Sequence, residues 1–114
     1  NADLNAQFAL KNLSKERDYF QRNGYTTDQA LNLAVLSHHA GIGAMKAAIK
    51  KAREDYKEKN EGEEIPTKDI TPEMVITAIA NIDQKDAGYS TPEKLHGRTK
   101  GFWEKVQKEV KLFK

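Results

Sequence analysis

The stretch AVLSHHAGIGAMKAAI, residues 34–49, is an apolar helical run that Gly41 and Gly43 interrupt and that resumes at once. Glycine adopts backbone conformations that other residues avoid, so the pattern predicts two helices that meet at a corner. Backbone N–H groups and the imidazoles of His38 and His39 lie at this corner, where a ligand reaches groups that a regular helix would bury. The glycine corner is therefore the first candidate site.

Composition limits the class of protein. The chain has 114 residues, with 19 Lys and Arg against 17 Asp and Glu and a formal net charge of +2. This length supports one domain with one core, and this charge balance names no polyanionic partner by itself. Cysteine is absent, which excludes disulfides and thiolate zinc sites, and no apolar run is long enough to cross a membrane. The chain begins at Asn1 without a signal peptide, so we expect one domain over 1–114, cut from a longer protein.

Helical periodicity extends over most of the chain. The first expected helix covers 3–21, and the second is buried and runs from a Thr26–Gln29 capping box to the glycine corner. A third helix over 44–59 is followed by a short helix that Thr71 caps and Pro72 begins. The last helix is amphipathic, with Phe102, Trp103, Val106, Val110 and Phe113 on its apolar side. Residues 83–96 predict a surface loop with at most one turn of helix, begun at Pro92. No alternating strand or repeat occurs, so the predicted fold class is all-α, with about five helices.

Several short motifs occur along the chain in a characteristic order. Asn5 precedes FALKNL at 8–13, AL at 30–31 leads to LAVLSHHAGIGAMKAAI at 33–49, and RTKGFWEKV occupies 98–106. This order resembles the latter part of the lytic transglycosylase and goose-type lysozyme family, in which an alanine-rich helix ends in Ala-Tyr-Asn-Ala-Gly-x-Gly and a Thr-Arg-x-Tyr-Val-x-Lys-Val helix closes the domain. The resemblance implies a lysozyme-like helical domain that recognises peptidoglycan glycan strands, in the cell envelope or outside the cell.

The resemblance also suggests the site residues. His38 and His39 stand where the family has Tyr-Asn, and imidazole keeps the capacity to donate and to accept hydrogen bonds. Sugars need paired donors and acceptors beside an aromatic or apolar wall, so the predicted sugar-binding residues are Tyr25, His38, His39, Gly41 and Gly43.

The catalytic acid of the family precedes the point that corresponds to the start of this chain. None of the glutamates Glu16, Glu54, Glu58 and Glu73 has the apolar surroundings that a general acid needs. We interpret them as charges on helix surfaces. Glycan cleavage would therefore need an acid from a preceding segment of the same parent protein.

Other interpretations of the corner stay open. Adjacent histidines on a helix point about a hundred degrees apart and His-x-x-x-His is missing, so no metal and no cofactor are expected. A DNA-binding helix-turn-helix would use the cations of the following helix, Lys46, Lys50, Lys51 and Arg53. Its tight-packing position falls on Ser37 and nearby acids dilute the charge, so nucleic acid is not favoured. In a structural interaction domain, the glycines would only let two helices pack.

Overall fold

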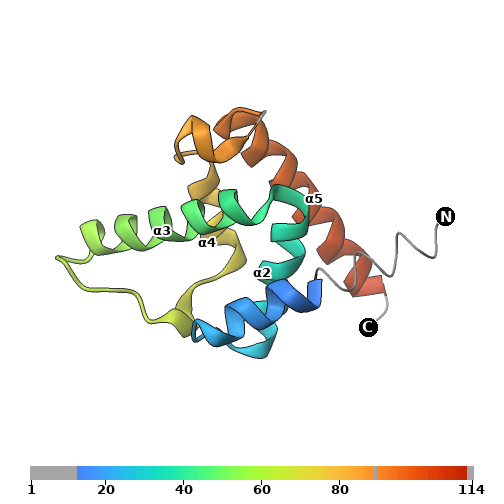
Figure 1. Cartoon of the computed structure of the whole chain (residues 1–114), viewed down its shortest axis with the longest axis horizontal. Helices are drawn as coiled ribbons and strands as arrows, with labels where there is room; N and C mark the ends of the chain where they lie inside the picture. Colours follow the sequence, from blue (N-terminus) through green and yellow to red (C-terminus); the bar gives the residue numbers. More distant parts are fainter. Residues whose placement is uncertain (1–12, 89, 113–114) are drawn as a thin grey trace.

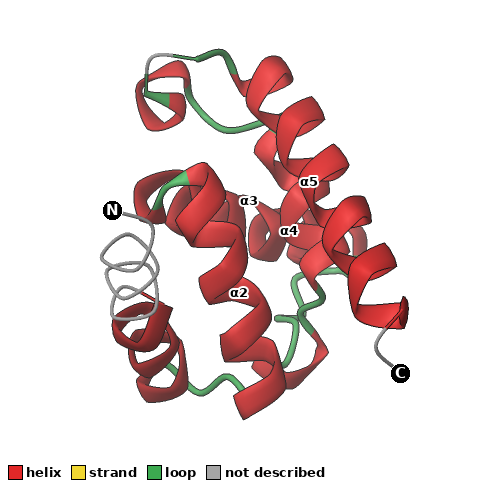
Figure 2. Ribbon diagram, turned by 90° about the vertical axis from the view of Figure 1, so that its right-hand side faces the viewer, coloured by secondary structure: helices red, strands yellow, loops and turns green. Residues whose placement is uncertain are grey.

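The computed structural model describes residues 13–88 and 90–112, and all regular elements in that part of the chain are helices (Figure 2). Residues 13–22 are helical, and they are followed by α2 (Thr27–Ala40), α3 (Ile42–Lys59), α4 (Pro72–Ile79) and α5 (Pro92–Leu112). The short 3-10 helices η1 (Thr67–Asp69) and η2 (Gln84–Ala87) lie before and after α4. The prediction of an all-α fold with about five helices is confirmed.

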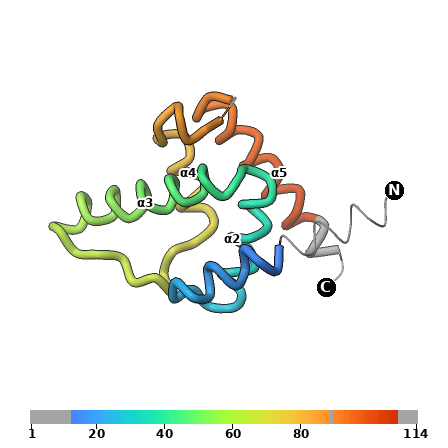
Figure 3. The backbone as a smooth tube through the Cα atoms, in the orientation of Figure 1, coloured from blue at the N-terminus to red at the C-terminus, as the bar shows by residue number. Residues whose placement is uncertain are grey.

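The helices enclose one core, in which α4 packs against both α3 and α5, and α2 contacts all three (Figure 1). The fully buried large side chains come from most of these elements: Phe20, Leu33, Leu36, Met45, Ile70, Val75 and Ile79. Figure 3 shows that the end of α3 reaches away from this core and that the chain returns through residues 60–71 to α4. The last residues of α3, 57–59, are exposed, as their mixed lysines and glutamate predicted.

The capping box at the start of α2 is present and has an additional role. The Gln29 Oε1 atom accepts from the Thr26 backbone N–H at 2.9 Å, and Thr26 Oγ1 accepts from the Gln29 backbone N–H at 3.2 Å. The Gln29 Nε2 atom also donates to the carbonyl oxygens of Thr67 and Ile70, both at 2.9 Å. One side-chain amide thus joins the first turn of α2 to the segment that precedes α4.

The prediction of a surface loop over 83–96 was wrong. Residues 84–87 form η2, and the helix that begins at Pro92 continues without interruption into the terminal helix. Thr91 Oγ1 caps its first turn by accepting from the Lys94 N–H at 3.2 Å. Every fourth residue of this helix, Leu95, Thr99 and Trp103, is buried, so packing outweighs the low helix propensity of the intervening glycines. Residues 3–12, the Val110 side chain and Phe113, which carried other predictions, lie outside the described part.

Candidate functional site

The corner between α2 and α3 consists of a single residue, Gly41. Its φ of 94° and ψ of 141° are accessible to glycine and strained for other residues. The Gly41 N–H donates to the Ser37 carbonyl at 2.8 Å, and the Gly41 carbonyl accepts from the Met45 N–H at 3.1 Å. The second glycine of the motif, Gly43, belongs to α3, which begins at Ile42. The helix break therefore needs one glycine and not two.

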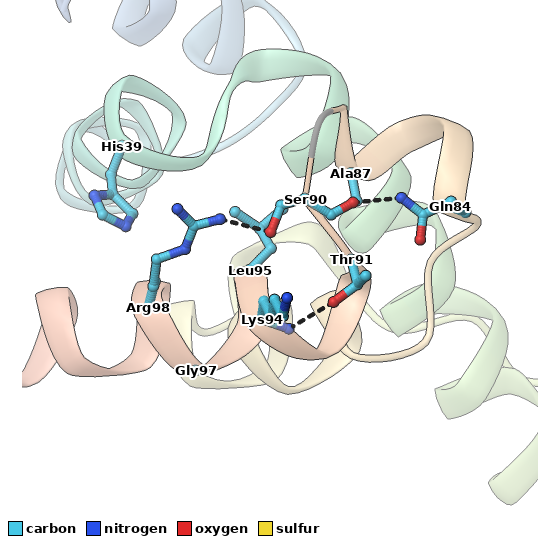
Figure 4. Close-up of a pocket in the computed structure, with 9 residues that line it drawn as sticks. All are labelled: His39, Gln84, Ala87, Ser90, Thr91, Lys94, Leu95, Gly97 and Arg98. Atoms are coloured by element: carbon cyan, nitrogen blue, oxygen red, sulfur yellow. Dashed lines mark hydrogen bonds between the residues drawn. The ribbon is translucent and has the colours of Figure 1, made fainter.

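An open cleft of about 1010 Å³ lies beside this corner (Figure 4). The corner contributes His39, and the other lining residues come from η2, the turn after it and the start of α5: Gln84, Ala87, Ser90, Thr91, Lys94, Leu95, Gly97 and Arg98. The cleft thus brings together two parts of the chain that are far apart in the sequence. It offers hydroxyl, amide and imidazole groups with two cations.

Contacts in and next to the cleft hold its polar groups in place. The His39 ring stacks on Phe102, with centroids 4.3 Å apart and ring planes inclined by 4°. The Arg98 Nη2 atom donates to Ser90 Oγ at 2.5 Å, and the Gln84 side-chain amide donates to the Ser90 carbonyl oxygen. These bonds join η2, the turn after it and the start of α5 into one connected unit. This unit, which faces His39 across the cleft, is the far wall.

The charge state of His39 follows from its surroundings. Although His39 is exposed overall, partial desolvation of its ring lowers the pKa of this imidazole, and the positive charges of Arg98 and His38 lower it further. At neutral pH the uncharged form of the His39 ring therefore predominates, and an uncharged imidazole presents one donor nitrogen and one acceptor nitrogen. This combination can accept from and donate to neutral polar groups.

The predicted site residues separate in space. His39 lines the cleft, whereas Gly43 lines a different cavity and His38 lines neither, although both histidines are exposed at the end of α2. Tyr25 is only 7% exposed and belongs to the core, where its ring packs edge-to-face on Phe20 at 5.6 Å. The five residues therefore do not form one binding surface.

The polar groups of the far wall were missed because residues 83–96 were expected to be a loop. Once α5 begins at Pro92, the residues Lys94, Arg98 and Phe102 follow one another every four positions and share a face. That spacing, read together with the Ser90-Thr91-Pro92 start signal, is the sequence feature that identifies this wall.

Glu16 differs from the other glutamates. Its Oε2 atom is buried and has no hydrogen-bond partner among the described residues, and burial raises the pKa of its carboxyl, partly offset by the charge of His38. Glu16 is thus partly buried and not a fully exposed surface charge, and the signal was its position four residues before the buried Phe20. Glu16 does not line the cleft.

The described residues include no group of three His, Cys, Asp or Glu side chains that could hold a metal ion. In the same part of the chain, the helices lack the combination of length and apolar character needed to span a bilayer. Comparison of the chain with protein families, curated proteins and solved structures gave no match.

Proposed function

We propose that this chain recognises peptidoglycan glycan strands, as the C-terminal part of a lytic transglycosylase-like or lysozyme-like domain. The observation that carries the proposal is the cleft in which His39 of the glycine corner faces the start of α5. Its volume of about 1010 Å³ is large enough for more than one sugar ring. Both of the sequence motifs nearest the cleft, the corner and the segment from residue 98 onward, belong to the resemblance with that family.

The chemistry of the wall supports a sugar as the ligand. Ser90, Thr91 and Gln84 offer neutral hydroxyl and amide groups, and uncharged His39 offers a donor and an acceptor. Leu95 and Ala87 supply apolar surface beside these polar groups, and the Phe102 ring supports the His39 ring by stacking. A glycan requires this mixture of hydrogen-bonding groups and apolar surface.

Binding without cleavage is the expected activity of these residues alone. None of the described residues that line the cleft carries a carboxyl group, and glycoside cleavage needs a carboxylic acid placed at the scissile bond. We therefore expect no release of muropeptides from purified peptidoglycan by the 114-residue chain. Release above a heat-inactivated control, abolished by Glu16→Gln, would contradict this and identify an acid within the chain.

A titration with chitooligosaccharides and soluble peptidoglycan fragments, followed by NMR, tests the binding site. We expect shifts at His39, Ser90, Thr91 and Arg98, with an affinity that changes little with salt for the uncharged sugars. His39→Ala should weaken binding roughly fivefold, the value of about one hydrogen bond. His96→Ala is the matched control, because His96 lies on α5 but does not line the cleft. Equal effects of the two variants, or shifts elsewhere, would refute the proposal.

The helix-turn-helix interpretation gains no support from the geometry of the corner. α2 and α3 are joined by Gly41 alone, whereas a helix-turn-helix uses a turn of about three or four residues. A DNA duplex that bound with a steep salt dependence and shifted the α3 lysines would revive it.

A further inference from the structure

A smaller pocket lies between α3 and the helix over residues 13–22. Its volume is about 300 Å³, and it is lined by Tyr19, Phe20, Asn23, Tyr25, Lys46, Ile49, Lys50 and Arg53. Among the described residues, none lines both this pocket and the cleft that contains His39. The proposed glycan site therefore leaves this pocket without a role.

The pocket concentrates positive charge on one face of α3, and the nearest carboxylates, Glu54, Asp83 and Asp86, line a neighbouring cavity that Lys46 and Lys50 also border. Lys46, Lys50 and Arg53 are spaced by four and three residues, which aligns them on one face of α3. None of the described residues that line the pocket is acidic. Within the described residues, the ion pairs join Arg17 to Asp18 and Lys51 to Asp55, so these three cations are not in ion pairs there.

Arg53 is held in position by neutral groups. Its Nη2 atom donates to Thr67 Oγ1 at 3.2 Å and to the Tyr25 hydroxyl at 3.5 Å. These contacts orient the guanidinium group but leave its charge unneutralised, which is the condition under which an arginine is ready to bind an anion.

Lys46 is oriented in a similar way. Its Nζ atom lies 4.5 Å from the centre of the Tyr19 ring, a cation–π contact that orders the ammonium group while its charge stays available. The exposed Lys50 follows one turn later on the same face.

We propose that this pocket binds a ligand that carries a phosphate group, with Arg53, Lys46 and Lys50 as the phosphate-binding residues. A phosphate monoester carries close to two negative charges at neutral pH, so three cations match it better than they match the single charge of a carboxylate. Arginine binds phosphate oxygens through a bidentate fork, and lysine binds them as a point charge. The apolar part of the ligand contacts the ring of Tyr19 and the side chain of Ile49. The volume limits that part to about the size of one ring.

Three small anions distinguish phosphate recognition from general attraction to negative charge. In NMR titrations of the full chain, we expect phenyl phosphate to bind more tightly than inorganic phosphate, because its ring contacts the apolar wall. We expect phenyl phosphate also to bind more tightly than benzoate, which carries the same ring with one charge. The shifts should concentrate at Asn23, Tyr25, Lys50 and Arg53. Benzoate binding as tightly as phenyl phosphate, or shifts outside the pocket, would overturn the proposal.

A pair of charge-neutralising variants tests the residues. Lys50→Gln removes an exposed cation of the pocket and should weaken phenyl phosphate binding roughly five- to tenfold. Lys59→Gln makes the same change on the same helix, outside the pocket and nine residues further on, and should leave the affinity unchanged. Equal losses in both variants would show that net charge alone attracts the ligand and would overturn the proposal. Far-ultraviolet circular dichroism verifies that both variants are folded.

Two further measurements distinguish this pocket from the glycan cleft and from an extended cationic surface. His39→Ala should not change phenyl phosphate affinity, so failure of the glycan proposal leaves this one standing and the reverse also holds. A neighbouring cavity shares Lys46 and Lys50 with this pocket and adds Lys51 and Lys85. A DNA duplex that shifts Lys51 and Lys85 as strongly as Lys50, with no binding of phenyl phosphate, would overturn the small-ligand site in favour of a surface for polyanions.

Discussion

Replacing Gly41 by alanine tests whether the corner depends on backbone conformation alone. An alanine Cβ built at Gly41 meets no atom of the described residues within 4 Å, so a clash with neighbours contributes nothing. The φ of 94° costs a non-glycine residue about 1–3 kcal/mol, and restriction of the unfolded chain by alanine returns about 0.4–1 kcal/mol. We expect Gly41→Ala to lower the free energy of unfolding by about 1–2 kcal/mol. For a chain of 114 residues this corresponds to a melting temperature lower by about 4–8 °C.

Gly43→Ala is the matched control, because it makes the same chemical change two residues away. Gly43 lies in the first turn of α3 without a positive φ, and its added Cβ also meets open space. This variant should raise the free energy of unfolding by a few tenths to about 1 kcal/mol. Urea denaturation followed by circular dichroism measures both variants. If Gly41→Ala matches the parent protein, or if Gly43→Ala is the more damaging change, the backbone argument for the corner is wrong.

Two further predictions concern single side chains. His39 should titrate below its ordinary pKa, and Arg98→Gln should move the pKa of His39 upward, as measured from imidazole shifts by NMR. Because the pKa of His39 is lower in the folded state than in the unfolded state, the neutral ring stabilises the fold fully above the unfolded pKa of about 6.5. This stabilisation declines as the pH falls toward the folded pKa. A pH-independent difference in the free energy of unfolding between His39→Gln and the parent protein would contradict this. Thr99 is fully buried and its hydroxyl has no partner among the described residues, so Thr99→Val should raise the free energy of unfolding by about 1 kcal/mol in urea titrations. A loss of stability would indicate a hydrogen bond at that hydroxyl.

Local signals in the sequence were sufficient to predict the helices of the first two thirds of the described chain. The cap at Thr26, the proline after Thr71 and the glycine at residue 41 each act within a few residues, and each occurs where it was expected. The start of α5 was also visible at Pro92, but its continuation was not. Gly97 and Gly101 lower intrinsic helix propensity, and only contacts of Leu95 and Trp103 with distant helices compensate for it.

The candidate site was less predictable because it joins segments that are far apart in sequence. His39 was predicted from the corner motif, but its partner Arg98 is brought near only by the packing of α5. Tyr25 was predicted to contribute to the aromatic or apolar wall that a sugar site needs. The structure buries Tyr25 instead, with its hydroxyl directed at Arg53, and one-dimensional patterns carry no information about that contact.

The Gln29 side-chain amide has a consequence for how the molecule opens. It bonds to backbone groups at Thr26, Thr67 and Ile70, so the start of α2 and the segment before α4 lose these bonds together. Two regions about forty positions apart in the chain should therefore behave as one cooperative unit in native-state hydrogen exchange. Without the Gln29 bonds, the start of α2 and the segment before α4 would open independently of each other. In Gln29→Ala the amide protons of the two regions should exchange with separate opening free energies.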